Sequence, residues 1–229
     1  MPIPIPHHGA AAVTRRSVAI VLFDDVEVLD FAGPFEVFSV CGRRSLLDPF
    51  DVYTVSERGQ TIRARNGLIV TPLHSFESAP SPDILLVPGG FGTRREMKSP
   101  VMLEFVARVG THCEFLLSVC TGALVLACAG LLDGLSATTH HLALDELRAV
   151  APRTTVREGA RIVDNGRVIL SSGVSAGIDM SLHVVARLLG DDLALETARY
   201  MEYEGDWQAR SASERRTGGG GGGALRPAT

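Results

Sequence analysis

The 229-residue sequence lacks the charge excess and the long apolar run that mark two broad classes of protein. Its formal net charge is -4, so it has neither a basic footprint for nucleic acid nor a polybasic patch for a membrane surface. The apolar run from Ala123 to Leu132 is far shorter than the roughly 20 residues that cross a bilayer. We therefore expect no nucleic-acid partner and no membrane partner.

Cysteine is also scarce, and its spacing argues against metal and redox motifs. The four cysteines form no CxxC pair and no Cys/His cluster with zinc spacing, so we expect no metal site. Residues 1–16 lack the charged-then-apolar order of a signal peptide, which predicts a cytoplasmic protein with reduced thiols. We interpret Cys41, Cys113 and Cys128 as buried packing residues, with Cys128 inside a helix.

The chain divides into one folded unit and two terminal segments. Residues 1–15 hold three prolines and few large apolar groups, which predicts a disordered N-terminal arm. Residues 209–229 include six consecutive glycines, which predicts a flexible tail. The folded domain is expected over residues 16–208. Its short apolar runs alternate with helical patterns, which is typical of an α/β fold whose mostly parallel sheet has helices on both faces.

The expected elements follow from periodicity and turn residues. Strands are expected at 17–23, 50–55, 83–87 and 115–119, helices at 31–40, 100–109, 141–150, 175–189 and 191–203 and after Cys120, and hairpins around Asn66-Gly67 and Asn165-Gly166. Ligands of such sheets bind beyond the carboxyl ends of the strands. Three loops fall at such ends, namely 24–30, 88–92 and 120–122, and we expect them to form one site.

Cys120 is the leading candidate within that site. The apolar run Phe115–Val119 leads directly into Cys120, and Gly122 and Ala123 allow a helix to start close to the strand. A sharp turn of this kind presents a nucleophile at the edge of the sheet, as in a nucleophile elbow. The first free N–H groups of the helix favour the thiolate form. The alternative is a buried structural thiol.

Other candidates surround this cysteine in the sequence. Gly89 and Gly90 follow a strand, and their N–H groups, with that of Thr121, are expected to bind an oxyanion; the alternative is a tight loop. Asp30 is either a helix N-cap or a carboxyl that moves a proton beside the thiol. His140 is either an accessory base or, with its neighbour at 141, part of a surface pair.

Taken together, these residues resemble the DJ-1/PfpI superfamily, which is similar to the class I glutamine amidotransferases. The resemblance covers residues 17–207 and rests on five segments: Leu29–Pro34, Val87–Gly90, Ser118–Gly122, Ala137–His140 and Ser175–Asp179. Within the superfamily, the chain looks most similar to isocyanide hydratases and to the amidotransferase-like domain of AraC-type regulators. The resemblance implies a flavodoxin-like, doubly wound sheet and a homodimer.

The resemblance also assigns roles to residues. It makes Cys120 the nucleophile, Asp30 the general acid/base, Thr121 a donor at the anion site that Gly89 and Gly90 line, and His140 an accessory group. Peptidase-like members carry His where this chain has Thr121, and glyoxalase-type members carry Glu where it has Asp30. Both differences argue against those activities. No helix-turn-helix pair follows residue 207 in this sequence, so direct DNA binding is not expected.

Three functions are consistent with this reading. The first is a cysteine-dependent hydratase that adds water to a small isonitrile, through a covalent thioimidate, and releases an N-substituted formamide without a cofactor. The second is a thiol-based redox or ligand sensor without turnover, since an accessible low-pKa thiol is a good oxidation site. The third is a hydrolase or glyoxalase-type activity on small carbonyl compounds.

Overall fold

The computed structural model describes residues 14–205, and the expectations for residues 1–13 and 206–229 lie outside this range. Its central feature is a seven-stranded sheet with the order β10-β11-β7-β6-β1-β2-β5. All neighbouring strands of this sheet are parallel except β10 and β11. The order β2-β1-β6-β7-β11 is that of a flavodoxin-like doubly wound sheet, which confirms the predicted fold class.

The strands of the described range are short, as in most parallel sheets. They are β1 (Arg16–Val21), β2 (Phe50–Ser56), β3 (Ile62–Arg63), β4 (Ile69–Val70), β5 (His74–Ser75), β6 (Ile84–Val87), β7 (Phe115–Val119), β8 (Ser136–Ala137), β9 (Thr155–Val156), β10 (Ile162–Asp164) and β11 (Val168–Ser171). Every residue of β6, β7 and β11 is buried, because helices cover both faces of a parallel sheet.

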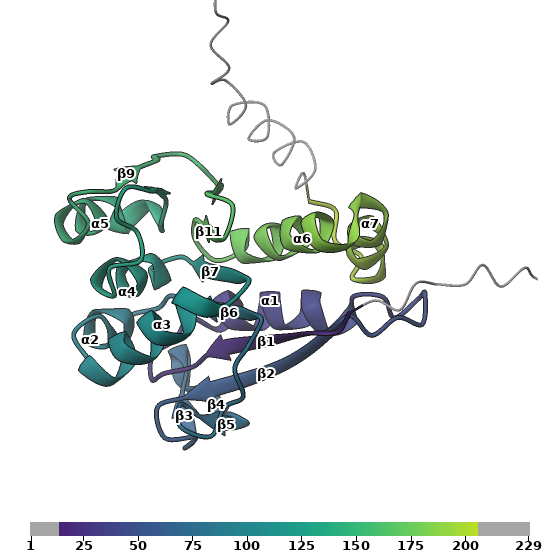
Figure 1. Cartoon of the computed structure of the whole chain (residues 1–229), viewed down its shortest axis with the longest axis horizontal. Helices are drawn as coiled ribbons and strands as arrows, with labels where there is room; N and C mark the ends of the chain where they lie inside the picture. Colours follow the sequence, from purple (N-terminus) through teal and green to yellow (C-terminus); the bar gives the residue numbers. More distant parts are fainter. Residues whose placement is uncertain (1–13, 206–229) are drawn as a thin grey trace, which may run out of the picture.

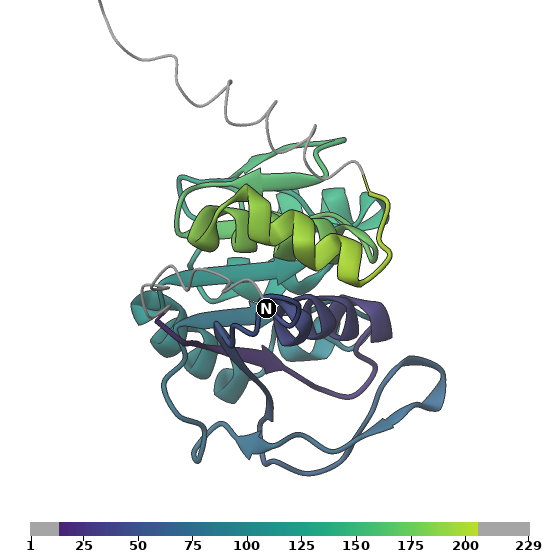
Figure 2. The same cartoon turned by 90° about the vertical axis from the view of Figure 1, so that its right-hand side faces the viewer.

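The helices form two layers around this sheet (Figures 1 and 2). They are α1 (Val28–Val40), α2 (Thr93–Glu96), α3 (Pro100–His112), α4 (Gly122–Cys128), α5 (Leu144–Val150), α6 (Ala176–Leu189) and α7 (Asp191–Tyr200), with 3-10 turns at Arg65–Gly67 and His141–Ala143. Helices α1, α6 and α7 contact one another, and α4 contacts α2, α3 and α5. In Figure 2, α1, α6 and α7 lie in front of the sheet.

Two close contacts seat α1 and α6 against each other and against β7. A Cβ built on Gly33 would lie 2.9 Å from Cγ1 of Ile178, and one on Gly177 would lie 3.1 Å from the methyl groups of Val119. These glycines let α1 approach α6 and let α6 approach β7, the strand that ends at Cys120. A side chain at either position would push these helices apart or away from β7.

Both hairpins are found at the expected turns. Strands β3 and β4 pair antiparallel around Asn66 and Gly67, which have φ angles of +58° and +89°. Strands β10 and β11 pair antiparallel around residues 165 and 166, and Gly166 has a φ of +85°. Left-handed backbone at Asn-Gly is the signature of tight hairpin turns, so the turn residues alone identified both pairs.

Some elements differ from the prediction, mostly where segments are short. Helix α1 begins three residues earlier than predicted, and residues 141–150 form a 3-10 turn followed by α5. Helix α7 ends at Tyr200, and the following turn brings the Tyr203 hydroxyl to Asp179 Oδ1 at 2.6 Å. Helix α2, strand β5 and the β8-β9 pair have four residues or fewer each and give no periodic signal.

Candidate active site

Three loops at the carboxyl ends of β1, β6 and β7 meet at Gly89. A Cβ built on Gly89 would lie 2.5 Å from the Thr121 nitrogen, 2.7 Å from Asp30 Oδ2 and 2.8 Å from the Cys120 Cβ. Strands β1 and β6 are neighbours at the point where the chain order of the sheet reverses, which is where open α/β sheets bind ligands. The structure therefore brings together the Asp30, Gly89-Gly90 and Cys120-Thr121 segments that the sequence singled out.

Cys120 occupies a strained turn between β7 and α4. Its φ is +56°, a left-handed conformation that few residues other than glycine adopt. Its N–H donates to the carbonyl oxygens of Ser171 and Ser172, and its own carbonyl accepts from the Thr139 hydroxyl at 2.8 Å. A Cβ at position 122 would lie 2.1 Å from the Val87 carbonyl oxygen, so the helix can start here only at glycine. These features are those of a nucleophile elbow.

Asp30 is held beside this turn by a backbone donor. It is the third residue of α1, whose N-cap is Glu27, so its carboxylate does not cap the helix. Asp30 Oδ2 accepts the Gly89 N–H at 3.0 Å, and the side chain is fully buried. Within residues 14–205, Asp30 Oδ1 has no hydrogen-bond partner of standard geometry. One carboxylate oxygen thus fixes the side chain, and the other is available to the thiol or to a substrate.

Burial and mutual interaction set the protonation of this pair. Burial raises the pKa of Asp30 to about 7, although the Cys120 thiol, the Gly89 N–H and the Val174 N–H act to lower it. Burial, followed by the charge of Asp30, raises the pKa of Cys120 to about 12, against the effect of the Thr121 N–H. The structure therefore does not favour the thiolate that we expected, because desolvation outweighs the helix N–H groups. At neutral pH the pair holds a thiol beside a carboxyl that can take its proton.

The hydroxyl of Thr121 connects the cysteine turn to the diglycine loop. Thr121 Oγ1 accepts the Gly90 N–H at 2.9 Å, and the hydroxyl of Thr93 lies 3.0 Å from it. In this structure the Gly89 N–H thus donates to Asp30, and the Gly90 N–H donates to Thr121. Their expected role as oxyanion donors stays a prediction. In that role, at least one of these N–H groups would leave its present acceptor and donate to the substrate. The Thr121 N–H already faces the thiol.

The His140 ring lies against Gly173, which stands between Ser172 and Val174 of the cysteine site. Its Nδ1 accepts the Leu142 N–H at 3.3 Å, its ring lies 4.3 Å from that of His141, and a Cβ on Gly173 would lie 2.2 Å from its Cδ2. Burial, His141 and the charge of Arg94 lower its pKa, which favours neutral imidazole. The interactions that hold and shift His140 do not include Asp30 or Cys120. Its accessory role stays a prediction.

Three residues of the site were not singled out from the sequence. Thr93 lies on the single-turn helix α2, Thr139 supports the Cys120 carbonyl, and Val174 directs its N–H toward Asp30 from a left-handed conformation with φ +51°. A β-branched residue in this conformation is strained, and such strain is concentrated at functional sites. Of these three residues, only Thr139 had a sequence signal, because it lies in the segment Ala137–His140 on which the family resemblance rests.

The remaining cysteines have structural surroundings. Cys41 and Cys113 are buried, as predicted, and burial raises the pKa of each thiol. Cys128 is the last residue of α4 and half-buried, whereas we predicted a position inside the helix. Across residues 14–205, no group of three or more His, Cys, Asp and Glu side chains is arranged to hold a metal ion. Nor is any helix of that range both long and apolar enough to cross a membrane.

Gly89→Ala is expected to lower turnover at this site by about 100-fold and to destabilise the fold by roughly 1–3 kcal/mol. The new methyl group would overlap Asp30 and the Cys120 turn, and the backbone at 89 is not left-handed, so the cost is steric. Gly110→Ala on α3 is the matched control, because its backbone is likewise not left-handed and its new Cβ would meet only side-chain atoms of Leu131 and Leu116, at 3.1–3.3 Å. Urea denaturation and steady-state kinetics measure both effects. Equal turnover in the two variants would contradict the packing described here.

Comparison with known proteins finds relatives of similar sequence. The chain is 34% identical over 189 residues to an isonitrile hydratase of Pseudomonas putida, covering 81% of this chain and 78% of that protein. It is 30% identical to the HTH-type transcriptional regulator GbdR of Pseudomonas aeruginosa, covering 82% of this chain and 51% of the regulator. The chain thus spans about half the length of that regulator.

Solved structures show the same fold. A ThiJ/PfpI family protein from Pseudomonas syringae superposes with a TM-score of 0.77 at 27% identity, covering 95% of this chain and 93% of that one. Drosophila melanogaster DJ-1beta superposes with a TM-score of 0.73 at 17% identity, covering 84% of this chain and 100% of its own. The model of the DJ-1/PfpI family matches residues 16–187. The chain therefore belongs to the DJ-1/PfpI family.

Proposed function

We propose that the protein is a cysteine-dependent hydratase that converts small isonitriles to N-substituted formamides. The observation that carries this proposal is the buried Cys120 thiol beside a carboxyl whose pKa is about 7. An isonitrile carbon must gain both a nucleophile and a proton, and this pair can supply both. The similarity to an isonitrile hydratase supports the same substrate class.

The first step forms a covalent intermediate. Cys120 Sγ attacks the terminal carbon of R–N≡C while Asp30 takes the thiol proton and delivers it to the same carbon. The product is the thioimidate R–N=CH–S–Cys120. Proton removal during the attack makes a free thiolate unnecessary, which suits a thiol whose pKa is raised. The Thr121 N–H faces the sulfur and stabilises the charge that develops on it.

The second step hydrolyses this intermediate. Asp30 takes a proton from water as the oxygen bonds to the thioimidate carbon and delivers that proton to the nitrogen, giving R–NH–CH(OH)–S–Cys120. The carbon–sulfur bond then breaks, and the hydroxyl proton passes through Asp30 to the sulfur. R–NH–CHO leaves and the thiol is restored. The net reaction converts R–NC and water to R–NH–CHO, and it uses no other reactant.

The test is an assay of purified protein with cyclohexyl isonitrile, in which N-cyclohexylformamide is measured by chromatography. Turnover is expected, and kcat/KM should rise with pH through about 7 and then level off, because Asp30 must be ionised to take the thiol proton. Cys128→Ala is expected to match the wild type, since that thiol lies at the far end of α4. Absence of the formamide would contradict the substrate, and a rate that falls as pH rises from 6 to 8 would contradict the role of Asp30.

The alternative functions have less support from the geometry. A peroxide sensor needs a thiolate at neutral pH, whereas the pKa of Cys120 is raised to about 12. The homodimer that we expected stays a prediction.

A further inference from the structure

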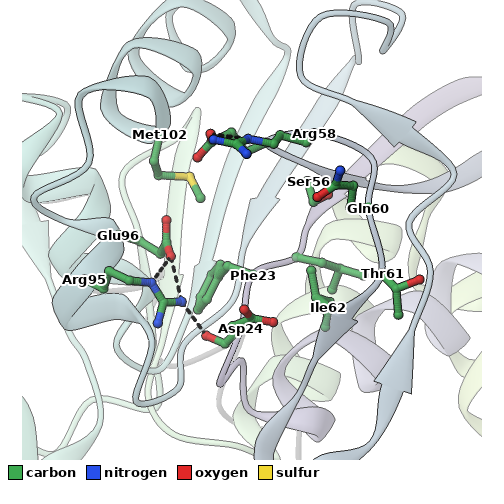
Figure 3. A pocket seen from close by; sticks show the side chains of 12 residues that line it. Phe23, Asp24, Ser56, Arg58, Gln60, Thr61, Ile62, Arg95, Glu96 and Met102 are labelled. Atoms are coloured by element: carbon green, nitrogen blue, oxygen red, sulfur yellow. Dashed lines mark hydrogen bonds and ion pairs between the residues drawn. The ribbon is translucent and has the colours of Figure 1, made fainter.

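A cavity whose lining includes none of Cys120, Asp30, Gly89 and Thr121 lies between α2 and α3 on one side and β2 and β3 on the other (Figure 3). Its volume is about 280 Å³, near the lower end of the range for small-molecule pockets. Eight of its twelve lining residues are polar or charged. The apolar side chains of Phe23, Ile62 and Met102 form a smaller part of the lining, against which a short hydrocarbon chain can pack.

The charged lining of this cavity has one negative charge in excess. The lining contains three carboxylates, those of Asp24, Glu57 and Glu96, and two guanidinium groups, those of Arg58 and Arg95. Arg95 pairs with Glu96 at 2.9 Å and donates to the Asp24 carbonyl at 2.8 Å, while Arg58 lies beside Glu57. A ligand with a single positive charge would balance this set.

Glu96 presents the polar group that such a ligand would meet. Its side chain is 10% exposed, and its Oε1 accepts from Arg95. Oε2 accepts no hydrogen bond from residues 14–205. This oxygen is accessible to solvent, and Glu96 lines the cavity, so Oε2 can be reached by a ligand there. A ligand with an N–H donor can therefore bind this oxygen, which a primary ammonium has and a quaternary ammonium lacks.

We propose that this cavity binds a small primary ammonium compound, with the ammonium group on Glu96 Oε2 and the hydrocarbon chain against Phe23, Ile62 and Met102. The carboxylate oxygen without a protein partner, the few apolar side chains and the excess negative charge fit this chemistry. Burial raises the pKa of Glu96, and the charges of Glu57 and Asp24 raise it further, so a bound cation would favour the ionised carboxylate.

The test is a titration of the protein, labelled with ¹³C at the methionine methyl groups, with n-butylammonium chloride. The Met102 signal, assigned with Met102→Leu, is expected to shift and saturate. Sodium butyrate and tetramethylammonium chloride are matched probes that should leave it unchanged. Glu96→Gln should weaken binding by about tenfold or more, because it removes a charge-assisted hydrogen bond. The control Glu104→Gln, an exposed residue of α3, should bind as the wild type does.

Arg58→Glu provides a second variant whose folding is not at risk, since the Arg58 side chain is 74% exposed. It adds negative charge at the rim of the cavity and should tighten n-butylammonium binding several-fold. A Met102 signal that does not saturate, an equal response to butyrate or tetramethylammonium, or weaker binding by Arg58→Glu would each overturn the proposal. These readouts are independent of isonitrile turnover.

Discussion

Cys120→Ala is expected to lower kcat/KM for isonitrile hydration by at least about 10⁴-fold, because no other group of the site can form the covalent bond to carbon. The substitution removes one sulfur atom from a position that is 6% exposed and leaves the hydrogen bonds of the turn in place, since these use backbone atoms and Thr139. The folded state should persist, which circular dichroism can verify.

Mass spectrometry makes this prediction sharper. Wild-type protein quenched in acid during turnover should carry the mass of one isonitrile on the peptide that contains Cys120. Cys120→Ala should carry none. Cys113→Ala is the matched buried control and should retain both the adduct and most of the activity, because that thiol lies before β7, at the opposite end of the strand from the site. Similar rates in Cys120→Ala and the wild type would disprove the nucleophile assignment.

Asp30→Asn is expected to have opposite effects on activity and stability. It should lower kcat/KM by about 10²- to 10⁴-fold, since the amide cannot take the thiol proton. It should also raise the free energy of unfolding at pH 8 by roughly 2–4 kcal/mol, because the pKa of Asp30 in the fold is about 7 and its ordinary value is 3.8. The Gly89 N–H can still donate to the amide oxygen.

The sign of the stability effect follows from proton binding. The folded protein holds the Asp30 proton to a higher pH than the unfolded chain does, so ionisation of Asp30 destabilises the fold increasingly as pH rises from about 4 to about 7. Urea denaturation at pH 5 and pH 8 should therefore give a larger difference between Asp30→Asn and wild type at pH 8. Asp145→Asn, at a side chain that is 97% exposed, should show little difference at either pH. A difference that shrinks with pH would contradict the buried carboxyl.

Local sequence patterns were sufficient for most of the fold and for the location of the site. Asn-Gly turns identified both hairpins because this dipeptide tolerates the left-handed backbone that such turns need. The position of the site followed from topology, since parallel strands bring Asp30, Gly89 and Cys120 to one edge of the sheet. Neither inference depended on side-chain packing.

Properties that depend on packing were not predictable. The raised pKa of Cys120 comes from burial by segments distant in sequence, whereas the local pattern showed only the helix N–H groups that act in the other direction. Thr93 escaped notice because a four-residue helix has no measurable period. The use of the Gly89 and Gly90 N–H groups by Asp30 and Thr121 is likewise a contact between separate loops.

The meeting of three loops at Gly89 has a consequence for how the candidate site forms during folding. Asp30, Gly89 and Cys120 are separated by 59 and 31 residues and become neighbours only when β1, β6 and β7 pair in register. Contacts between distant parts of a chain form slowly, because the loops between them must close first. A partly folded chain can therefore contain correct hairpins and helices and still lack the juxtaposition of Asp30 and Cys120.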